Sequence, residues 1–214
     1  MEKNYHAWLW EKMGEDCVNA LIKNGFDAHF VPSVQKAKAL ILNMISAYET
    51  FGFAGSDTTR ALGVLEALEA NRKIIYDHWQ EGLSKEADLE IRLQQGRCHC
   101  FLCSANAVSM TGELINVDGV GNRTSAMAFG PEKVVVAAGM NKVTHDLESA
   151  LRRIREVSGP MRARSLNMDT PCARTGRCTD CNVPQRICRI TTILHRKPML
   201  TDVSVVLINE ALGF

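Results

Sequence analysis

The stretch Lys133-Val134-Val135-Val136-Ala137-Ala138 is apolar at every position after its lysine. A continuous apolar run of this length is typical of a β-strand that is covered on both faces, which is the usual situation in parallel sheets. Helices must then pack on both sides of the sheet, so strand and helix patterns should alternate along the chain. The stretch therefore predicts an α/β protein if the flanking sequence shows this alternation.

The flanking sequence does alternate. Apolar residues recur at helical spacing before Asn24-Gly25, and short β-branched or aromatic runs separate this pattern from further helical ones. We predict helices near residues 5–21, 34–48, 61–68, 84–95 and 147–157, with Ser158-Gly159-Pro160 ending the last of them. We predict strands near residues 28–31, 50–54, 73–76, 98–103, 113–117, 133–138 and 203–208. The predicted fold class is an open, mainly parallel sheet flanked by helices.

The length of 214 residues suits one domain, and 46% hydrophobic residues are enough for a substantial core. We therefore expect a single α/β domain over residues 1–214. Residues 159–189 interrupt the alternation, because they are polar, rich in cysteine and contain three prolines. We expect an irregular segment there, which is ordered only if something ties it together.

The net charge of the chain bears on the kinds of partner that it could bind. A net charge of +1 gives no electrostatic reason to expect nucleic acid or acidic membranes. No stretch reaches the roughly 20 apolar residues that a membrane-spanning helix needs. Glu11, Glu15 and Asp16 lie where a signal peptide would need an uncharged core. We expect a cytoplasmic protein, and the sequence leaves its oligomeric state, including a homo-oligomer, open.

The turn Gly55-Ser56-Asp57-Thr58-Thr59 follows a predicted strand and precedes a predicted helix. In parallel sheets, ligands bind at the carboxyl ends of strands. Glycine allows close approach of a ligand to the backbone, and the free N–H groups and three hydroxyls suit an anion. Capping of the helix by Ser56 or Asp57 explains the same residues, and Asp57 would repel an anion. Both interpretations stay open.

A second polar segment is Asn116-Val117-Asp118-Gly119-Val120-Gly121-Asn122-Arg123. A hairpin turn explains Asp118-Gly119, but arginine is the side chain that binds carboxylate or phosphate with two parallel hydrogen bonds. Ordinary polar loops are the alternative. The recurrence of this chemistry at successive strand ends favours one pocket for a small anionic ligand. The predicted ligand-binding residues are Gly55, Ser56, Asp57, Thr58, Thr59, Ser104, Asn106, Asn116, Asp118, Gly119, Gly121, Asn122, Arg123, Asn141 and Lys142.

The late cysteines Cys172, Cys178, Cys181 and Cys188 have the spacing C-x5-C-x2-C-x6-C. Structural disulfides are not expected in a reducing compartment. A C-x2-C turn offers two thiolates to one metal, and four thiolates would complete a zinc site or ligate an iron–sulfur cluster. Free thiols in a loop are the alternative. We favour a metal or cluster, because the segment otherwise lacks an obvious core.

Three side chains are candidates for catalysis. Cys103 could be a nucleophile, but His99 is the only histidine near it in the sequence, and a buried free thiol is the commoner role. Asp57 and Asp118 could act as a general base if burial raised their pKa, although capping and turn formation explain both. We assign no catalytic residue, and the sequence leaves open whether the protein is an enzyme.

Four segments occur in a specific order: 53–59, 101–108, 114–123, and 129–142 with Phe129-Gly130-Pro131 at its start and Asn141-Lys142 at its end. Together they resemble the lactate-utilisation (LUD) domain family over nearly the whole chain. That family is similar in fold to the ribose-5-phosphate isomerase, glucosamine-6-phosphate deaminase and CoA-transferase group. The cysteine-rich segment looks like one subgroup of the family.

The resemblance implies a role in oxidising L-lactate to pyruvate, beside iron–sulfur partner proteins. It also implies a pocket where the turn 55–59 meets the loop 116–123. Two alternatives stay open on the residues and the fold analogy. The protein could be an independent enzyme for a small phosphorylated or CoA-linked substrate, or a metal- or cluster-bearing interaction protein without catalysis.

Overall fold

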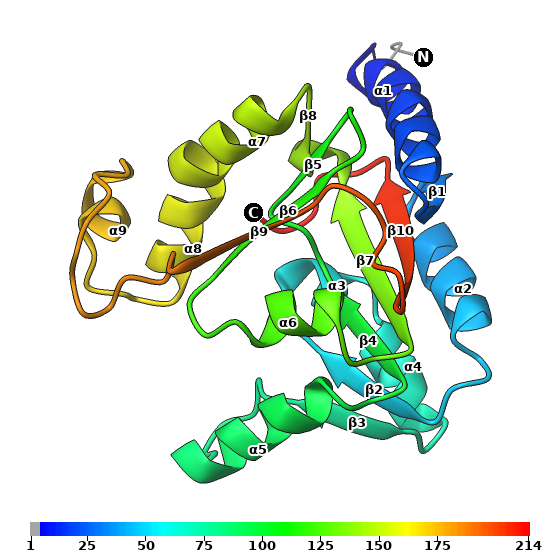
Figure 1. Cartoon of the computed structure of the whole chain (residues 1–214), viewed down its shortest axis with the longest axis horizontal. Helices are drawn as coiled ribbons and strands as arrows, with labels where there is room; N and C mark the ends of the chain where they lie inside the picture. Colours follow the sequence, from blue (N-terminus) through cyan, green and yellow to red (C-terminus); the bar gives the residue numbers. More distant parts are fainter. Residues whose placement is uncertain (1–4) are drawn as a thin grey trace.

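The apolar run lies in β7 (Lys133–Gly139), which is buried at every residue and is an inner strand of a six-stranded sheet. The computed structural model describes residues 5–214. All neighbouring strands of this sheet are parallel, in the order β1-β10-β7-β4-β2-β3 (Figure 1). The other strands are β1 (Asp27–Val31), β2 (Thr50–Phe53), β3 (Ile74–Asp77), β4 (Cys100–Cys103) and β10 (Asp202–Ile208). The predicted α/β class with a mainly parallel sheet is confirmed.

Helices cover both faces of the six-stranded sheet. Val134 and Val136 of β7 belong to an apolar cluster that includes residues of α1, whereas Val135 and Ala137 belong to a second cluster with α2 and α4. Successive side chains of a strand point to opposite faces, so a strand between two helical layers must be apolar throughout. The helices are α1 (Tyr5–Lys23), α2 (Val34–Met44), α3 (Asp57–Ala61), α4 (Val64–Ala70), α5 (Lys85–Gln95), α6 (Asn122–Ala128), α7 (Leu147–Arg153), α8 (Gly159–Ser165) and α9 (Pro171–Thr175).

A second sheet of four short strands was not predicted. Its order is β8-β5-β6-β9, and β6 is antiparallel to both of its neighbours. The sequence pattern indicated only β6, as the strand predicted near residues 113–117. Strands of two to five residues are too short to show a clear period. The bounds are β5 (Ala107–Ser109), β6 (Leu114–Asp118), β8 (Val143–Thr144) and β9 (Ile190–Leu194).

Two predicted helix bounds are wrong. The third predicted helix is divided into α3 and α4, because Gly63 between them adopts a positive φ of 64°. The helix predicted to end at Ser158-Gly159-Pro160 continues instead, through a π-helical turn over Ile154–Ser158, directly into α8. Pro160 lies in the first turn of α8, directly after the π-helical turn. Residues 159–189, which we expected to be irregular, therefore contain α8 and α9.

The first predicted helix is present, but only part of its apolar face is buried. Cys17 and Leu21 are buried, whereas Tyr5 and Leu9 are exposed. No helix within residues 5–214 is long and apolar enough to cross a membrane.

Candidate functional site

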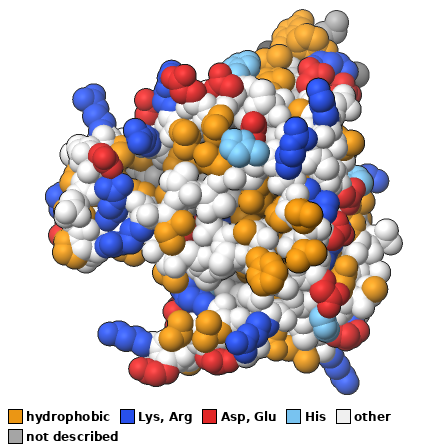
Figure 2. Space-filling view, viewed as in Figure 1, with side chains coloured by type: hydrophobic (Ala, Val, Ile, Leu, Met, Phe, Trp, Pro, Cys, Tyr) orange, Lys and Arg blue, Asp and Glu red, His pale blue; other side chains and the backbone are white. Residues whose placement is uncertain are grey.

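A cavity of about 380 Å³ lies at the carboxyl ends of four parallel strands. The turn after β2 supplies residues 55–58, the turn after β3 supplies His78 and Trp79, the turn after β4 supplies residues 104–106, and the turn after β7 supplies Lys142. Residues of β6, α6 and α8 complete the wall. Figure 2 shows the surface hollowed between the part of the molecule that carries α8 and the part that carries α5.

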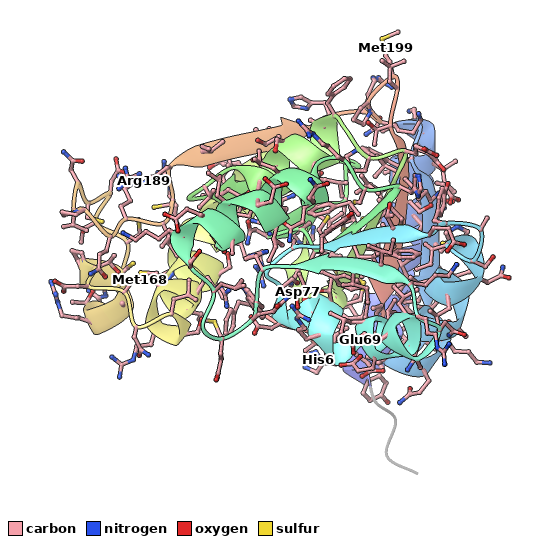
Figure 3. The ribbon with its side chains drawn as sticks, turned by 90° about the horizontal axis from the view of Figure 1, so that it is seen from below. His6, Glu69, Asp77, Met168, Arg189 and Met199 are labelled. Atoms are coloured by element: carbon pink, nitrogen blue, oxygen red, sulfur yellow. The ribbon has the colours of Figure 1, made fainter. Side chains whose placement is uncertain are left out.

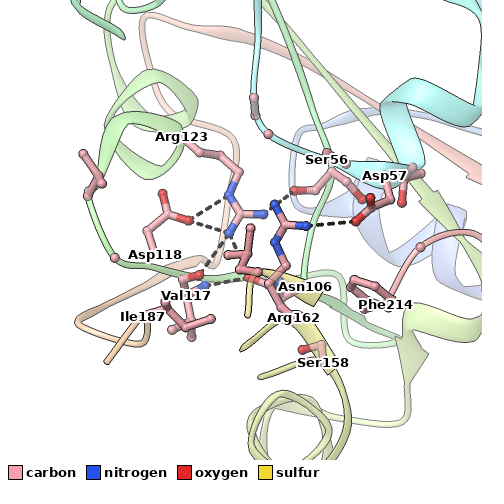
Figure 4. Close-up of a pocket in the computed structure, with 18 of the residues that line it drawn as sticks. Ser56, Asp57, Asn106, Val117, Asp118, Arg123, Ser158, Arg162, Ile187 and Phe214 are labelled. Carbon is pink, nitrogen blue, oxygen red and sulfur yellow. Dashed lines mark hydrogen bonds and ion pairs between the residues drawn. The ribbon is translucent and has the colours of Figure 1, made fainter. Parts of the chain in front are cut away.

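Most of the predicted ligand-binding residues line this cavity (Figure 4). They are Gly55, Ser56, Asp57, Thr58, Ser104, Asn106, Asp118, Gly119, Asn122, Arg123 and Lys142. The remaining four have other positions. Thr59 donates its N–H to the Ser56 hydroxyl, and the Asn116 side chain accepts a hydrogen bond from the Asn106 N–H. Gly121 caps α6 with a positive φ, and Asn141 bonds the backbone of Leu212 and Gly213.

Lys142 is the buried cation of this cavity. Its side chain extends from a 3-10 turn after β7, and the residue is 4% exposed. Nζ donates to the Thr58 hydroxyl at 2.8 Å and to the Ser104 hydroxyl at 2.9 Å. Burial, with the positive charges of Arg153 and Arg123, lowers the pKa of Lys142 to about 7. Both acceptors are neutral, and the charge of Asp57 raises the pKa by less than burial and the two arginines lower it. The ammonium therefore lies in an environment that favours the binding of an anion.

The other buried lysine among the described residues provides a contrast. Lys133 is 6% exposed, yet its Nζ lies 2.6 Å from an Asp202 carboxylate oxygen and 3.9 Å from one of Asp27. Its charge is thus balanced within the protein, which is the common situation for a buried lysine. The hydroxyl partners of Lys142 are therefore a feature of the cavity rather than a consequence of burial alone.

Arg123 lines the cavity, but protein groups already satisfy most of its donors. Nε donates to Asp118 at 2.9 Å, and Nη2 donates to the Asn106 side chain at 2.9 Å and the Val117 carbonyl at 3.0 Å. Nη1 donates to the Ser104 carbonyl at 3.2 Å. The guanidinium therefore joins the strand end after β4 to β6. Its first role is to position these segments, and its charge adds to the positive field.

Arg162 has fewer fixed contacts. Its only carboxylate partner among the described residues is Asp57, at 3.3 Å, and its guanidinium lies over the Trp79 ring at 4.9 Å from the centroid. Burial lowers the pKa of Arg162, and the positive charge of Arg123 acts in the same direction. A Cβ on Gly55 would lie 2.4 Å from the Trp79 indole nitrogen, so glycine is needed for this packing. Figure 4 shows the guanidinium groups of Arg123 and Arg162 facing the same space.

The Gly55–Thr59 turn both caps a helix and lines the cavity. Ser56 caps α3 by accepting the Thr59 N–H, and the Asp118 carboxylate accepts the Thr124 N–H at the start of α6. Ser56, Asp57 and Asp118 also line the cavity. Capping and lining are therefore compatible, because the capping side chains lie at the strand ends where the cavity forms.

His78 is a neutral polar group of the cavity wall, and its ring contacts the buried side chain of Gln95. Gln95 is fully buried, and its amide group contacts the Phe53 carbonyl and the His78 ring, both at 2.8 Å. The Asn122 amide donates to Gln95 at 2.9 Å. Burial and the charge of Arg92 lower the pKa of His78 to about 4. The imidazole is therefore neutral at pH 7 and does not add to the cationic field.

Cys103 is fully buried in the core, and burial raises the pKa of its thiol to about 12. A neutral thiol without exposure is a poor nucleophile. This environment supports the packing role rather than the catalytic one.

Sequence reasoning missed several lining residues. His78 and Trp79 directly follow β3, so the same strand-end rule that selected Gly55 could have selected them. Arg162 and Met168 come from the segment that the pattern described as irregular, and no local signal placed them near the sheet.

A second cavity, of about 170 Å³, is lined by all four late cysteines. Cys172, Cys181 and Cys188 are half-buried, Cys178 is exposed, and all four are free thiols. Arg186 fixes the segment by donating to the backbone carbonyls of Cys181 at 2.5 Å and Cys188 at 2.8 Å. Figure 3 shows Met168 and Arg189 at the end of the molecule that carries α8 and α9. Within residues 5–214, no three His, Cys, Asp or Glu side chains converge closely enough for one metal ion.

Residues 14–208 match the LUD domain family, so the chain belongs to this family, which is associated with lactate utilisation. A crystal structure of a DUF162 family protein from Deinococcus radiodurans has the same fold, with a TM-score of 0.54 and 12% sequence identity. The superposition covers 93% of this chain and 98% of that one. A comparison with curated proteins gives no match. The family resemblance seen in the sequence is confirmed.

Proposed function

We propose that this LUD-domain protein binds a small carboxylate of lactate metabolism, L-lactate or pyruvate, in the strand-end cavity, and that it works with redox partner proteins. The observation that carries the proposal is Lys142, a buried ammonium whose acceptors are two hydroxyls. A bound carboxylate would supply the missing negative charge. The LUD family's association with lactate utilisation supports this choice among small anions.

The charges of the cavity wall also favour an anion. The wall contains four cationic side chains, Arg92, Arg123, Arg162 and Lys142, against two carboxylates, Asp57 and Asp118. Arg123 is neutralised by Asp118, and Arg92 by Asp88 outside the wall. Arg162 keeps one long contact to Asp57, so Lys142 and Arg162 are the two cations best able to accept a ligand carboxylate.

The size of the cavity supports a second candidate. A volume of about 380 Å³ is within the range of sites for complete small metabolites and exceeds the need of a three-carbon acid. A sugar phosphate or the acyl end of a CoA ester would therefore also find room and a cationic wall. This is the independent-enzyme alternative.

A binding panel separates these candidates. We expect L-lactate and pyruvate to bind the full chain in calorimetry and to raise its thermal unfolding temperature, because each ligand binds only the folded protein. Sugar phosphates and CoA esters are the comparison ligands, and acetamide is the uncharged control. If a phosphorylated or CoA-linked compound binds more tightly than lactate and pyruvate, the second candidate function is favoured over the first. If no compound of the panel binds, the proposal is contradicted.

The affinity for lactate should depend on pH. The pKa of Lys142 is lowered to about 7, so the ammonium that attracts the carboxylate is present below this pH and is lost above it. We expect lactate affinity to be highest near pH 6 and to fall by about tenfold for each pH unit above 8. Calorimetry from pH 6 to 9 measures this. The variant Lys142→Arg keeps its charge over the whole range, so its lactate affinity should be nearly constant, and equal slopes for both proteins would contradict the role of Lys142.

The four-cysteine cavity supports a further proposal, namely that the late cysteines bind an iron–sulfur cluster or zinc. The support for this proposal is that Cys172, Cys178, Cys181 and Cys188 all line one cavity, although no three of them converge on one point within the described residues. Arg155, Arg162 and Arg186 line the same cavity, and their charge would offset that of the thiolates. A bound cluster would supply one-electron transfer.

Metal analysis tests this proposal. We expect the protein purified without oxygen to carry stoichiometric iron, or else zinc, and the variant Cys181→Ser to lose most of it. Cys17→Ala is the matched control, because Cys17 is a buried thiol of α1 outside the segment. Wild-type protein free of both metals, or a Cys17→Ala variant that loses as much metal as Cys181→Ser, would disprove the site.

A further inference from the structure

The hydrogen bonds of Lys142 leave one position on its nitrogen open. Nζ contacts the hydroxyls of Thr58 and Ser104. Each hydroxyl directs its own hydrogen to a backbone carbonyl, Thr58 to Leu212 at 3.1 Å and Ser104 to Ala105 at 3.3 Å. Both hydroxyls must therefore accept from Lys142. In the neutral amine, the two N–H bonds are used in this way, and the lone pair takes the remaining tetrahedral position.

A neutral amine is available under ordinary conditions. Burial and the charges of Arg153 and Arg123, opposed in part by the charge of Asp57, bring the pKa of Lys142 to about 7, so amine and ammonium coexist at neutral pH. Arg153 is fixed beside this region by hydrogen bonds to the carbonyls of Asn141 and Asn106, at 2.9 Å and 2.8 Å. A desolvated lysine near other cations is the arrangement that activates an amine as a nucleophile.

The remaining requirement is a carbonyl held near this nitrogen. Lys142 lines the same cavity as Arg162, whose guanidinium has only the long contact to Asp57 among carboxylates of the described residues. Arg162 offers a partner for a carboxylate, and the lone pair of Lys142 offers one for an adjacent carbonyl carbon. A 2-oxo acid carries both groups on neighbouring atoms.

We propose that the amine of Lys142 attacks the carbonyl carbon of a bound 2-oxo acid and forms an imine with it. The C–N bond forms, the C–O bond breaks, and the oxygen leaves as water with the two amine hydrogens. No electrons are gained or lost, so no oxidant is needed. The inference rests on the proposed function, because it assumes a small carboxylate in the cavity. L-lactate, which has a hydroxyl instead of the carbonyl, would bind but could not react.

Reductive trapping tests the proposal. The full chain is incubated with pyruvate and sodium cyanoborohydride, which reduces an imine to a stable secondary amine. We expect mass spectrometry to find one reduced pyruvate adduct, on the peptide that contains Lys142. Its yield should be highest near pH 7, because Lys142 is protonated at lower pH and the binding of the carboxylate weakens at higher pH. Lactate in place of pyruvate should give no adduct, and added lactate should lower the yield by competition.

The variant Lys142→Arg is the matched control, because it keeps the charge and removes the nucleophilic amine. We expect it to bind pyruvate in calorimetry and to give no adduct at this site. Wild-type protein that binds pyruvate without an adduct at Lys142 overturns the imine and leaves the carboxylate site intact. Wild-type protein that neither binds pyruvate nor forms the adduct overturns both. Adducts spread over exposed lysines, and equal in the Lys142→Arg variant, also overturn the imine.

Discussion

Lys142→Met should weaken the binding of L-lactate by about 100-fold, which corresponds to about 2.7 kcal/mol of binding free energy. Methionine has a similar shape and also fits a buried position, but it removes the ammonium that has only the Thr58 and Ser104 hydroxyls as acceptors. Calorimetry at pH 6, where the wild-type lysine is charged, gives the largest difference. Lys12→Met is the control, since Lys12 forms an exposed pair with Glu15, and its lactate affinity should equal that of wild type.

A loss of lactate binding by Lys142→Met is not expected to come from a loss of folding stability. The pKa of Lys142 is lowered on folding from 10.5 to about 7, so the buried charge destabilises the empty protein fully below pH 7, and this cost decreases as the pH rises toward 10.5. The Lys142→Met variant should therefore be at least as stable as wild type at pH 6. If the variant is folded and still binds lactate with wild-type affinity, Lys142 does not hold the ligand.

Arg123→Met should cost about 3–5 kcal/mol of unfolding free energy, because it leaves the buried Asp118 carboxylate without its partner. The same substitution also removes the bonds to Asn106, Ser104 and Val117 that join the two segments. Urea denaturation measures the loss. Arg152→Met is the matched control: it breaks an exposed pair with Glu148 and should change stability by less than about 0.5 kcal/mol.

A double variant distinguishes the charge from the packing. Asp118→Asn added to Arg123→Met removes the stranded carboxylate, so the double variant should be more stable than Arg123→Met alone. If Arg123→Met alone loses no more stability than Arg152→Met, the hydrogen bonds of Arg123 contribute little to the free energy of unfolding. Arg123 would then be free to serve as a ligand contact.

The fold could be predicted because its deciding signal is local. The apolar run 133–138 indicates a strand that is covered on both faces, and the flanking sequence patterns predict the helices that cover it. The convergence of the turn 55–59 and Lys142 follows from parallel strand directions alone. These inferences need no knowledge of side-chain partners.

The rest depends on partners distant in sequence. Nothing near Arg123 in the sequence shows that its guanidinium is occupied by Asn106 and Ser104, from another strand end. The position of Arg162 in the cavity wall could not be predicted, because Ser158-Gly159-Pro160 resembles the end of a helix. In the structure the helix continues through the π-helical turn, and α8 lies beside the cavity. Proline at the start of a helix and proline after a helix give similar local patterns.

The two cavities have a common wall. Asn106, Val117, Ser158, Arg162 and Ile187 line both the strand-end cavity and the four-cysteine cavity. A group bound on one side that favours one arrangement of these side chains changes the free energy of binding on the other, and by thermodynamic linkage the two effects must be equal. If the thiols bind a metal or cluster and the strand-end cavity binds a carboxylate, as proposed, each of the two ligands changes the affinity of the protein for the other by the same factor.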